Sequence, residues 1–160
     1  MTTAELPASL AEIVEDFQSV PDPQRLELLL EFSDELPELP ERYAGHTEEM
    51  EQVVECQTPL FLAVELDRTG EHAADPLVQL FVAAPAEAPT SRGFASVLQQ
   101  GVAGLPASTV LEVPEDLASR LGLAKALTPL RLRGMSALLG RLKRNVREQL
   151  AVGSDAGGPA

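Results

Sequence analysis

The most informative segment of this chain is the apolar run LFLAVEL, which extends from Leu60 to Leu66. It is short and bounded by turn residues, with Pro59 before it and Asp67-Arg68-Thr69-Gly70 after it. This pattern predicts a buried β-strand that ends in a hairpin turn. A second apolar run, Val78 to Val82, predicts another strand, and residues 71–74 predict a weaker one between the two. Three adjacent strands with short links favour an antiparallel meander.

Apolar residues at helical spacing lie on both sides of the predicted strands. Before them, residues 10–18 form one stripe behind a capping-box pattern at Ser9 and Glu12, and a second helix follows Pro21-Asp22-Pro23. After them, we expect a helix near Phe94, short helices between 106 and 121, and a long helix from about Pro129 to Leu150 with its basic residues largely off the apolar stripe. This order predicts an α+β fold, with N-terminal helices, a three-stranded antiparallel sheet and C-terminal helices packed on it. We expect a single domain over residues 1–150 and a flexible tail over residues 151–160.

The chain of 160 residues is strongly acidic, with a formal net charge of −13. Such a surface repels phosphate backbones, so we expect no nucleic acid partner. The charge is uneven, because residues 1–90 hold 20 acidic and 3 basic side chains whereas residues 91–160 hold 5 and 9. This asymmetry favours protein partners with complementary patches. Residues 1–17 lack the basic and apolar regions of a secretory signal and no apolar run suits a membrane span, so we expect a cytoplasmic protein without membrane contact.

One cysteine is the main candidate for chemistry in this sequence. There is no G-x-G-x-x-G, Walker, H-E-x-x-H or G-x-S-x-G motif, and the spacing of His46 and His72 offers no support for a metal site, so we expect none. Because Cys56 is the only cysteine in the sequence, an internal disulfide is excluded, and one possible thiol nucleophile remains just before the strand at Leu60. A lone cysteine is most often a small buried hydrophobe, and the neighbouring Glu55 disfavours the thiolate.

Cys56-Gln57-Thr58, placed immediately before a strand, is one of five collinear segments that resemble a known family. The others are Glu15-Asp16-Phe17, Leu36-Pro37-Glu38-Leu39-Pro40-Glu41, Ser91-Arg92-Gly93-Phe94 and the run LTPLRLRGM from Leu127 to Met135. Together they cover about residues 10–150, and they resemble the SufE family of sulfur acceptors, the partners of Suf-type cysteine desulfurases. The resemblance implies a SufE-like version of the α+β fold described above.

The same resemblance implies a sulfur-relay function in iron–sulfur cluster assembly. A SufS-type cysteine desulfurase, which carries PLP, would hold sulfur from cysteine as a persulfide, and Cys56 would accept that sulfur, stimulate the enzyme and pass the sulfur to a SufBCD-like scaffold. The chain would be an accessory sulfur-transfer protein and not an enzyme in its own right, with no cofactor of its own. Arg131, Arg92 and Gln57 match family positions and are implied to bind the partner. The loop near residues 50–58 is implied to tuck against the body and to swing out on docking.

Three positions near these motifs differ from the family pattern. Glu55 stands where the family usually has glycine, Gln52 where it often has arginine, and Arg133 where it often has asparagine. A side chain at position 55 restricts the backbone, since only glycine reaches positive φ at low cost, and it places a negative charge beside the nucleophile. The departures therefore bear on the conformation of the loop and on the pKa of the thiol.

Two other function classes stay open at the level of sequence. In one, the chain is a non-catalytic acidic protein that binds and regulates a desulfurase or another partner, with Cys56 inert. In the other it is an independent thiol enzyme such as a peroxidase or thioltransferase, which is disfavoured because there is no resolving cysteine and no sequence-adjacent His or Lys to activate the thiol. Cys56→Ser separates the sulfur relay from the regulatory function, since it abolishes stimulation of a desulfurase only if the chain is a sulfur relay.

Overall fold

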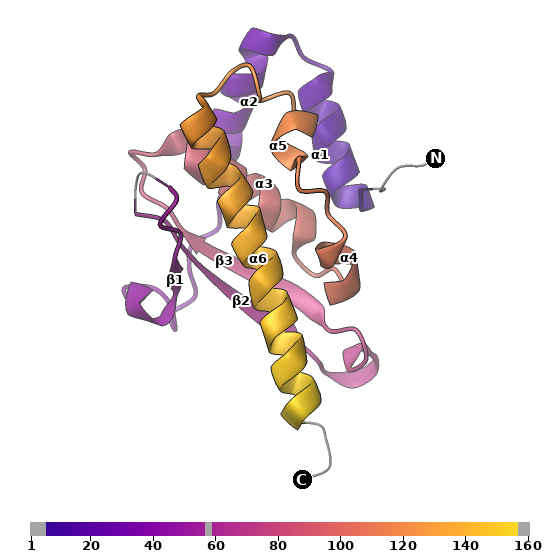
Figure 1. Cartoon of the computed structure of the whole chain (residues 1–160). Helices are drawn as coiled ribbons and strands as arrows, with labels where there is room; N and C mark the ends of the chain where they lie inside the picture. The colour runs from indigo at the N-terminus through magenta and orange to yellow at the C-terminus, as the bar shows by residue number, and fades with distance from the viewer. Residues whose placement is uncertain (1–5, 57–58, 157–160) are drawn as a thin grey trace.

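A small antiparallel sheet with helices packed on it forms the frame of the molecule (Figure 1). The computed structural model describes residues 6–56 and 59–156, and within them the sheet has the order β1 (Glu51–Gln52), β2 (Phe61–Asp67), β3 (Leu77–Ala83). β2 and β3 pair along their whole length, and alternate residues of β3 are buried, as a strand with one face on the core requires. The predicted α+β class with a three-stranded antiparallel sheet is confirmed.

The third strand is β1, and the weak strand expected at residues 71–74 is absent from its place between β2 and β3. Gly70 has a φ of 59°, which turns the chain out of the extended conformation, and Gly70–His72 form a short 3-10 helix, η2. Residues 71–74 also lack the β-branched and aromatic residues that favour a pleated surface. β1 is only two polar residues long and pairs with the start of β2, where Gln52 lies opposite Phe61.

The described helices follow the apolar stripes of the sequence. They are α1 (Ala8–Gln18), α2 (Asp22–Asp34), α3 (Pro89–Val102), α4 (Ala107–Leu111), α5 (Leu117–Arg120) and α6 (Pro129–Ala156), with the 3-10 helix η1 (Thr47–Glu49) before β1. The capping box expected at the start of α1 is not formed, because Pro7 is the N-cap and Ser9 Oγ donates to the carbonyl of Gly101 in α3 at 2.6 Å. α6 does not end at residue 150 but continues to Ala156, so the first residues of the expected tail are helical.

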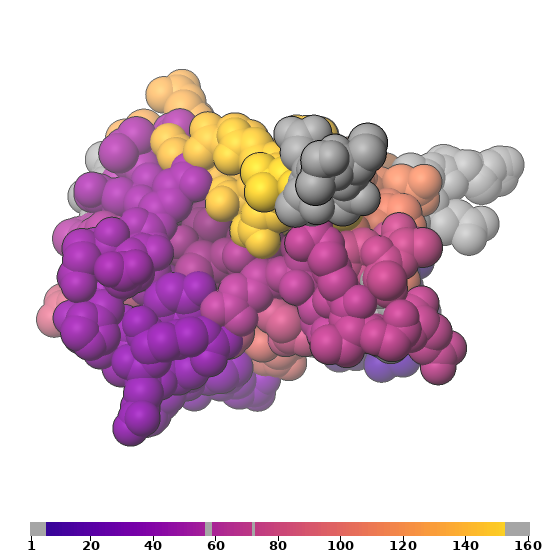
Figure 2. All heavy atoms as spheres, turned by 90° about the horizontal axis from the view of Figure 1, so that it is seen from below, coloured from indigo at the N-terminus to yellow at the C-terminus, as the bar shows by residue number. Residues whose placement is uncertain are grey.

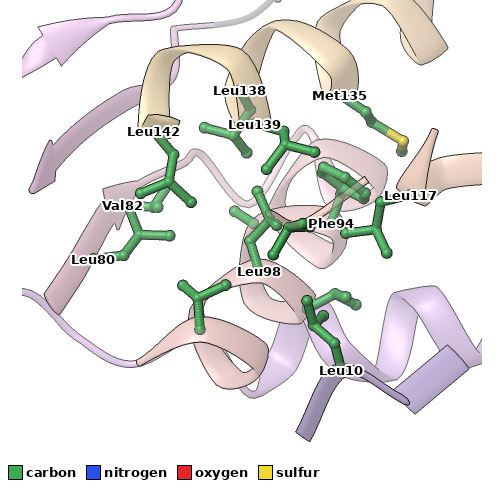
Figure 3. Close-up of a cluster of buried hydrophobic side chains, with 14 of the residues drawn as sticks. Leu10, Leu80, Val82, Phe94, Leu98, Leu117, Met135, Leu138, Leu139 and Leu142 are labelled. Atoms are coloured by element: carbon green, nitrogen blue, oxygen red, sulfur yellow. The ribbon is translucent and has the colours of Figure 1, made fainter. Parts of the chain in front are cut away.

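The hydrophobic core lies where α3 and α6 cover the sheet, and Figure 3 shows side chains of α6 and α3 pointing toward one another there. The core side chains labelled in that view come from α1, β3, α3, α5 and α6: Leu10, Leu80, Val82, Phe94, Leu98, Leu117, Met135, Leu138, Leu139 and Leu142. α2 packs closely on α3 through Gly93, because a Cβ at that position would lie 2.3 Å from the carbonyl oxygen of Leu29. The apolar stripe predicted for the last helix lies in this core, because its residues Met135, Leu138, Leu139 and Leu142 are buried.

Lys143 is buried, although the sequence places it among basic residues off the apolar stripe of α6. Its Nζ donates to the carbonyl of Val113 and pairs with Glu115 Oε2 at 2.6 Å. Both acceptors come from the connection between α4 and α5, which the tertiary fold brings to α6. A buried ammonium needs such partners, and here they tie α6 to that connection.

The last turns of α6 lie against the connection between β2 and β3, which Figure 2 shows in pink beside the yellow end of the helix. Arg68 donates to the carbonyl of Gln149 at 2.6 Å, and Gln149 Nε2 donates to the carbonyl of Val64 in β2 at 2.6 Å. α6 is thus held to the sheet near its C-terminal end as well as at the core. No helix in the described part of the chain is long and apolar enough to cross a membrane.

Candidate functional site

Cys56 lies at the end of a tight turn that follows β1. The amide of Val53 donates to the carbonyl of Leu60 at 2.8 Å, and the amide of Cys56 donates back to the carbonyl of Val53 at 3.1 Å. Val54, at the tip of this turn, has a relative exposure of 66%, whereas Cys56 is half-buried. The turn therefore presents an apolar side chain to solvent and directs the cysteine inward. We call residues 53–56 the cysteine turn.

The thiol of Cys56 rests on the first turns of α6. Its Sγ lies 3.8 Å from the carbonyl oxygen of Gly134, within reach of a weak S–H hydrogen bond, and Cys56 packs at the border of the hydrophobic core. A Cβ at position 134 would lie 3.2 Å from Sγ, which is closer than most Cβ contacts in proteins. Gly134 thus makes room for the cysteine turn.

The surroundings of Cys56 favour the neutral thiol. Burial raises the pKa of Cys56 above its usual value, the negative charge of Glu55 raises it further, and the positive charge of Arg141 opposes both. The free protein therefore carries Cys56 as a sheltered thiol at neutral pH. A thiolate, which is the nucleophilic form, requires a change in these surroundings.

Arg141 of α6 binds Glu55, the residue directly before Cys56, and so connects the cysteine turn to the helix. Its Nε and Nη2 each donate to a carboxylate oxygen of Glu55 at 3.0 Å, a bidentate pair. None of the described non-glycine residues has a positive φ, so Glu55 fits the turn without backbone strain although the family usually has glycine there. A hydrogen bond from its own backbone lowers the pKa of Glu55, and Arg141 lowers it further against the effect of burial.

The same guanidinium also holds Glu51, at the start of β1. Arg141 Nη1 pairs with Glu51 Oε2 at 2.5 Å, Arg144 pairs with the same oxygen, and Asn145 Nδ2 donates to Glu51 Oε1 at 2.9 Å. Burial raises the pKa of Glu51, but the hydrogen bonds from Asn145, Arg141 and Arg144 outweigh it and hold the pKa below its usual value. The carboxylate before the cysteine turn, Glu51, and the one within it, Glu55, are thus both bound to one face of α6.

The two arginines predicted to bind a partner have different surroundings. Arg131 is exposed on the first turn of α6, and its Nη1 donates to Thr90 Oγ1 at 2.9 Å. Arg92 is half-buried, and its Nε and Nη1 donate to the carbonyls of Ser33 and Ala84 at 2.9 and 2.8 Å. Arg131 is therefore placed on the surface one turn before Gly134, whereas Arg92 joins α3 to the end of α2 and the segment after β3. Gln57, the third predicted residue, lies outside the described residues.

His46 does not form a metal site with the described acidic residues. His46 is exposed, with Nδ1 3.3 Å from Glu48 Oε2. Among the side chains that the structure describes, no group of three or more His, Cys, Asp or Glu could hold a metal ion.

The sequence singles out Cys56, but it does not point to Arg141, Glu51 or Gly134 as parts of its surroundings. Glu51 precedes the cysteine turn, Glu55 lies within it, and Arg141 lies off the apolar stripe of α6, so the opposite charges are visible in sequence. Their pairing is not, because 86 residues separate Glu55 from Arg141 and the strongly acidic N-terminal half offers many other carboxylates.

Comparison with known proteins gives one family. Residues 11–146 match the family model described as SufE, Fe-S metabolism associated domain. An uncharacterized SufE-like protein of Mycobacterium tuberculosis is 54% identical over 146 residues, which cover 91% of this chain and 96% of that protein. A SufE-like protein of Synechocystis is 30% identical over 138 residues, which cover 84% of this chain and 77% of that protein.

A solved structure supports the same relationship at the level of fold. The solution structure of a hypothetical protein from Thermus thermophilus has a TM-score of 0.74 and 39% identity to this chain. The alignment covers 92% of this chain and 99% of that one, so the similarity extends over nearly the whole fold.

Proposed function

This chain belongs to the SufE family, which is associated with Fe–S metabolism, and from that premise we propose that it is a sulfur acceptor for a cysteine desulfurase. Cys56 takes persulfide sulfur from a PLP-dependent, SufS-type enzyme, and the chain stimulates that enzyme and passes the sulfur to an iron–sulfur cluster scaffold of the SufBCD type. The observation that carries the proposal is the position of Cys56, the only cysteine of the chain, on a turn braced against α6.

The transfer step is a thiol exchange on sulfur. The Cys56 thiolate attacks the terminal sulfur of the desulfurase persulfide, a new S–S bond forms on Cys56, and the S–S bond on the desulfurase breaks. The desulfurase cysteine leaves as a thiolate. Cys56 loses one proton and the desulfurase cysteine gains one. Because one S–S bond forms as another breaks, the step needs no added oxidant or reductant.

The geometry of the cysteine turn suits a carrier better than a free-standing thiol enzyme. The half-buried thiol with its raised pKa reacts slowly with small molecules in solution, and it becomes a better nucleophile once docking changes its surroundings. The same shelter would protect a bound persulfide from water and stray reductants. In this proposal the chain is an accessory protein in the cytoplasm, and PLP stays on the desulfurase.

The exposed residues beside Cys56 supply a docking surface in this proposal. Val54 offers an apolar contact at the tip of the turn, and Arg131 offers a positive charge on the first turn of α6. Gln57 follows the nucleophile directly in sequence and is proposed to contact the same partner. Arg92 donates to the carbonyls of Ser33 and Ala84, so in this proposal it stabilises the fold and does not contact the partner directly.

The test is stimulation of a SufS-type desulfurase by the wild-type chain and by Cys56→Ser, followed as alanine formed from cysteine. We expect stimulation with the wild type and none with Cys56→Ser, while both variants show the same circular dichroism. Equal stimulation by Cys56→Ser would refute the relay. The chain would then be a non-catalytic regulator of the enzyme.

A further inference from the structure

We propose that Arg141 is a positioning residue that latches the cysteine turn onto α6 through Glu55. The inference deepens the proposed function, on which it rests for its biological meaning, by naming what keeps Cys56 sheltered before a desulfurase docks. The latch itself is a property of the isolated chain.

The two sides of this latch differ in how firmly they are anchored. Arg141 projects from a helix that is held by the core, by Lys143 and by Gln149. The cysteine turn is held at its first residue, where Val53 is buried in the core and pairs with Leu60 after a strand of only two residues, so the residues after Val53 are the less firmly held part. A bond between such partners restrains the turn and leaves the helix unchanged.

The bonds themselves are of the kind that restrain geometry. The Glu55 carboxylate is engaged through both oxygens, which fixes its orientation as well as its distance. The Arg141 side chain is 17% exposed, so water screens the pair less than a fully exposed one. Because Cys56 follows Glu55 directly, release of Glu55 removes one restraint on the thiol beside the carbonyl of Gly134.

A partner can open the latch from the Glu55 side. The Glu55 side chain is 38% exposed, against 17% for Arg141, so Glu55 is the accessible member of the pair. A cationic side chain of the docking desulfurase can therefore take over the carboxylate of Glu55. Arg141 keeps its second carboxylate, Glu51, which Arg144 and Asn145 also hold, so the start of β1 stays in place.

The test is the rate at which a neutral alkylating agent, iodoacetamide, modifies Cys56 in the isolated chain near neutral pH. Arg141→Gln and Glu55→Gln each remove the bidentate pair, and Arg147→Gln removes an exposed arginine from the same helix as a matched control. We expect both latch variants to react roughly two- to tenfold faster than the wild type, as the loss of one partly screened ion pair implies, and the control to react at the wild-type rate.

The two latch variants have opposite direct effects on the charge around Cys56. The comparison therefore distinguishes opening of the turn from a purely electrostatic effect on the thiol. Removing the negative Glu55 favours the thiolate, whereas removing the positive Arg141 disfavours it. Acceleration by both variants therefore supports opening of the turn. Acceleration by Glu55→Gln together with slowing by Arg141→Gln would show a purely electrostatic effect and would overturn the latch, as would unchanged rates in both.

A double variant checks that the two residues act as one unit. Glu55→Gln with Arg141→Gln breaks the same pair as either single change, so we expect the double variant to react at about the rate of the faster single variant. Multiplied effects would contradict a shared latch. Because no desulfurase is present, the latch can fail while the relay holds, and loss of stimulation by Cys56→Ser tests the relay whatever the alkylation rates are.

Discussion

The carbonyl oxygen of Gly134 lies 3.8 Å from Sγ of Cys56, across 78 residues of sequence. The contact joins a turn beside the smallest strand of the sheet to the longest helix of the fold, and it is possible because position 134 carries no side chain. The reactivity of the cysteine is thus coupled to the packing of the turn on α6.

Gly134→Ala should loosen this contact without weakening the fold. The new Cβ would lie 3.2 Å from Sγ, so the sulfur must move by a few tenths of an ångström, while alanine inside a helix is favoured over glycine by about 1 kcal/mol. We expect faster alkylation of Cys56 and an unfolding free energy that does not fall. Gly140→Ala is the control, because nothing lies within 4 Å of a Cβ there, and it should leave alkylation unchanged. Equal alkylation rates in the two variants would contradict the role of Gly134.

Glu51 should contribute stability that depends on pH. Its pKa is lower in the folded chain than in the unfolded chain, so its contribution is fully present above the unfolded value of 4.5 and is lost as the pH falls through the folded value. We expect Glu51→Gln to lower the free energy of unfolding by about 1–2 kcal/mol at pH 7. Urea unfolding should show that this difference shrinks below about pH 4. A difference that stays constant across this range would mean that the carboxylate charge plays no part.

Arg92→Ala should destabilise the chain itself. Its guanidinium satisfies the carbonyls of Ser33 and Ala84 in a half-buried site, and leaving them without a donor costs about 1–3 kcal/mol. The measurement is urea or thermal unfolding of the purified variant. Unchanged stability with weaker binding to a desulfurase would instead place Arg92 in the interface.

Arg131→Ala should affect docking and leave stability almost unchanged. The side chain is exposed, and charge steering by an exposed group is screened by salt. We expect the variant to bind a desulfurase several-fold more weakly at low ionic strength and to approach wild-type affinity at high ionic strength. Titration at two salt concentrations measures this. Equal affinities at both would count against an electrostatic role for Arg131.

The sequence predicts the parts of this fold that follow from local pattern. β2 and β3 are apolar runs bounded by turn residues, and α6 has an apolar stripe, so each is visible without tertiary information. β1 is not visible, because Glu51 and Gln52 are polar and become a strand only by pairing with β2. The burial of Lys143 is not visible in sequence either, since the carbonyl of Val113 that accepts its hydrogen bond comes from a distant connection.

The candidate site also combines features that are visible in the local sequence with features that depend on tertiary contacts. Cys56 is recognisable from its neighbours in sequence, and the resemblance of five collinear segments adds the expected chemistry. Its raised pKa, the pairing of Glu55 with Arg141 and the space provided by Gly134 arise from contacts between distant segments. The charge of Glu55 beside the thiol is visible in sequence, but its engagement by Arg141 is not.

The most direct test of the sulfur relay is the intact mass of the chain after incubation with a SufS-type desulfurase and free cysteine. We predict that the mass rises by one sulfur atom, that reduction reverses the gain, and that Cys56→Ser shows none. An unchanged mass, with a desulfurase that is turning over cysteine in the same mixture, would contradict the assignment of Cys56 as the sulfur acceptor.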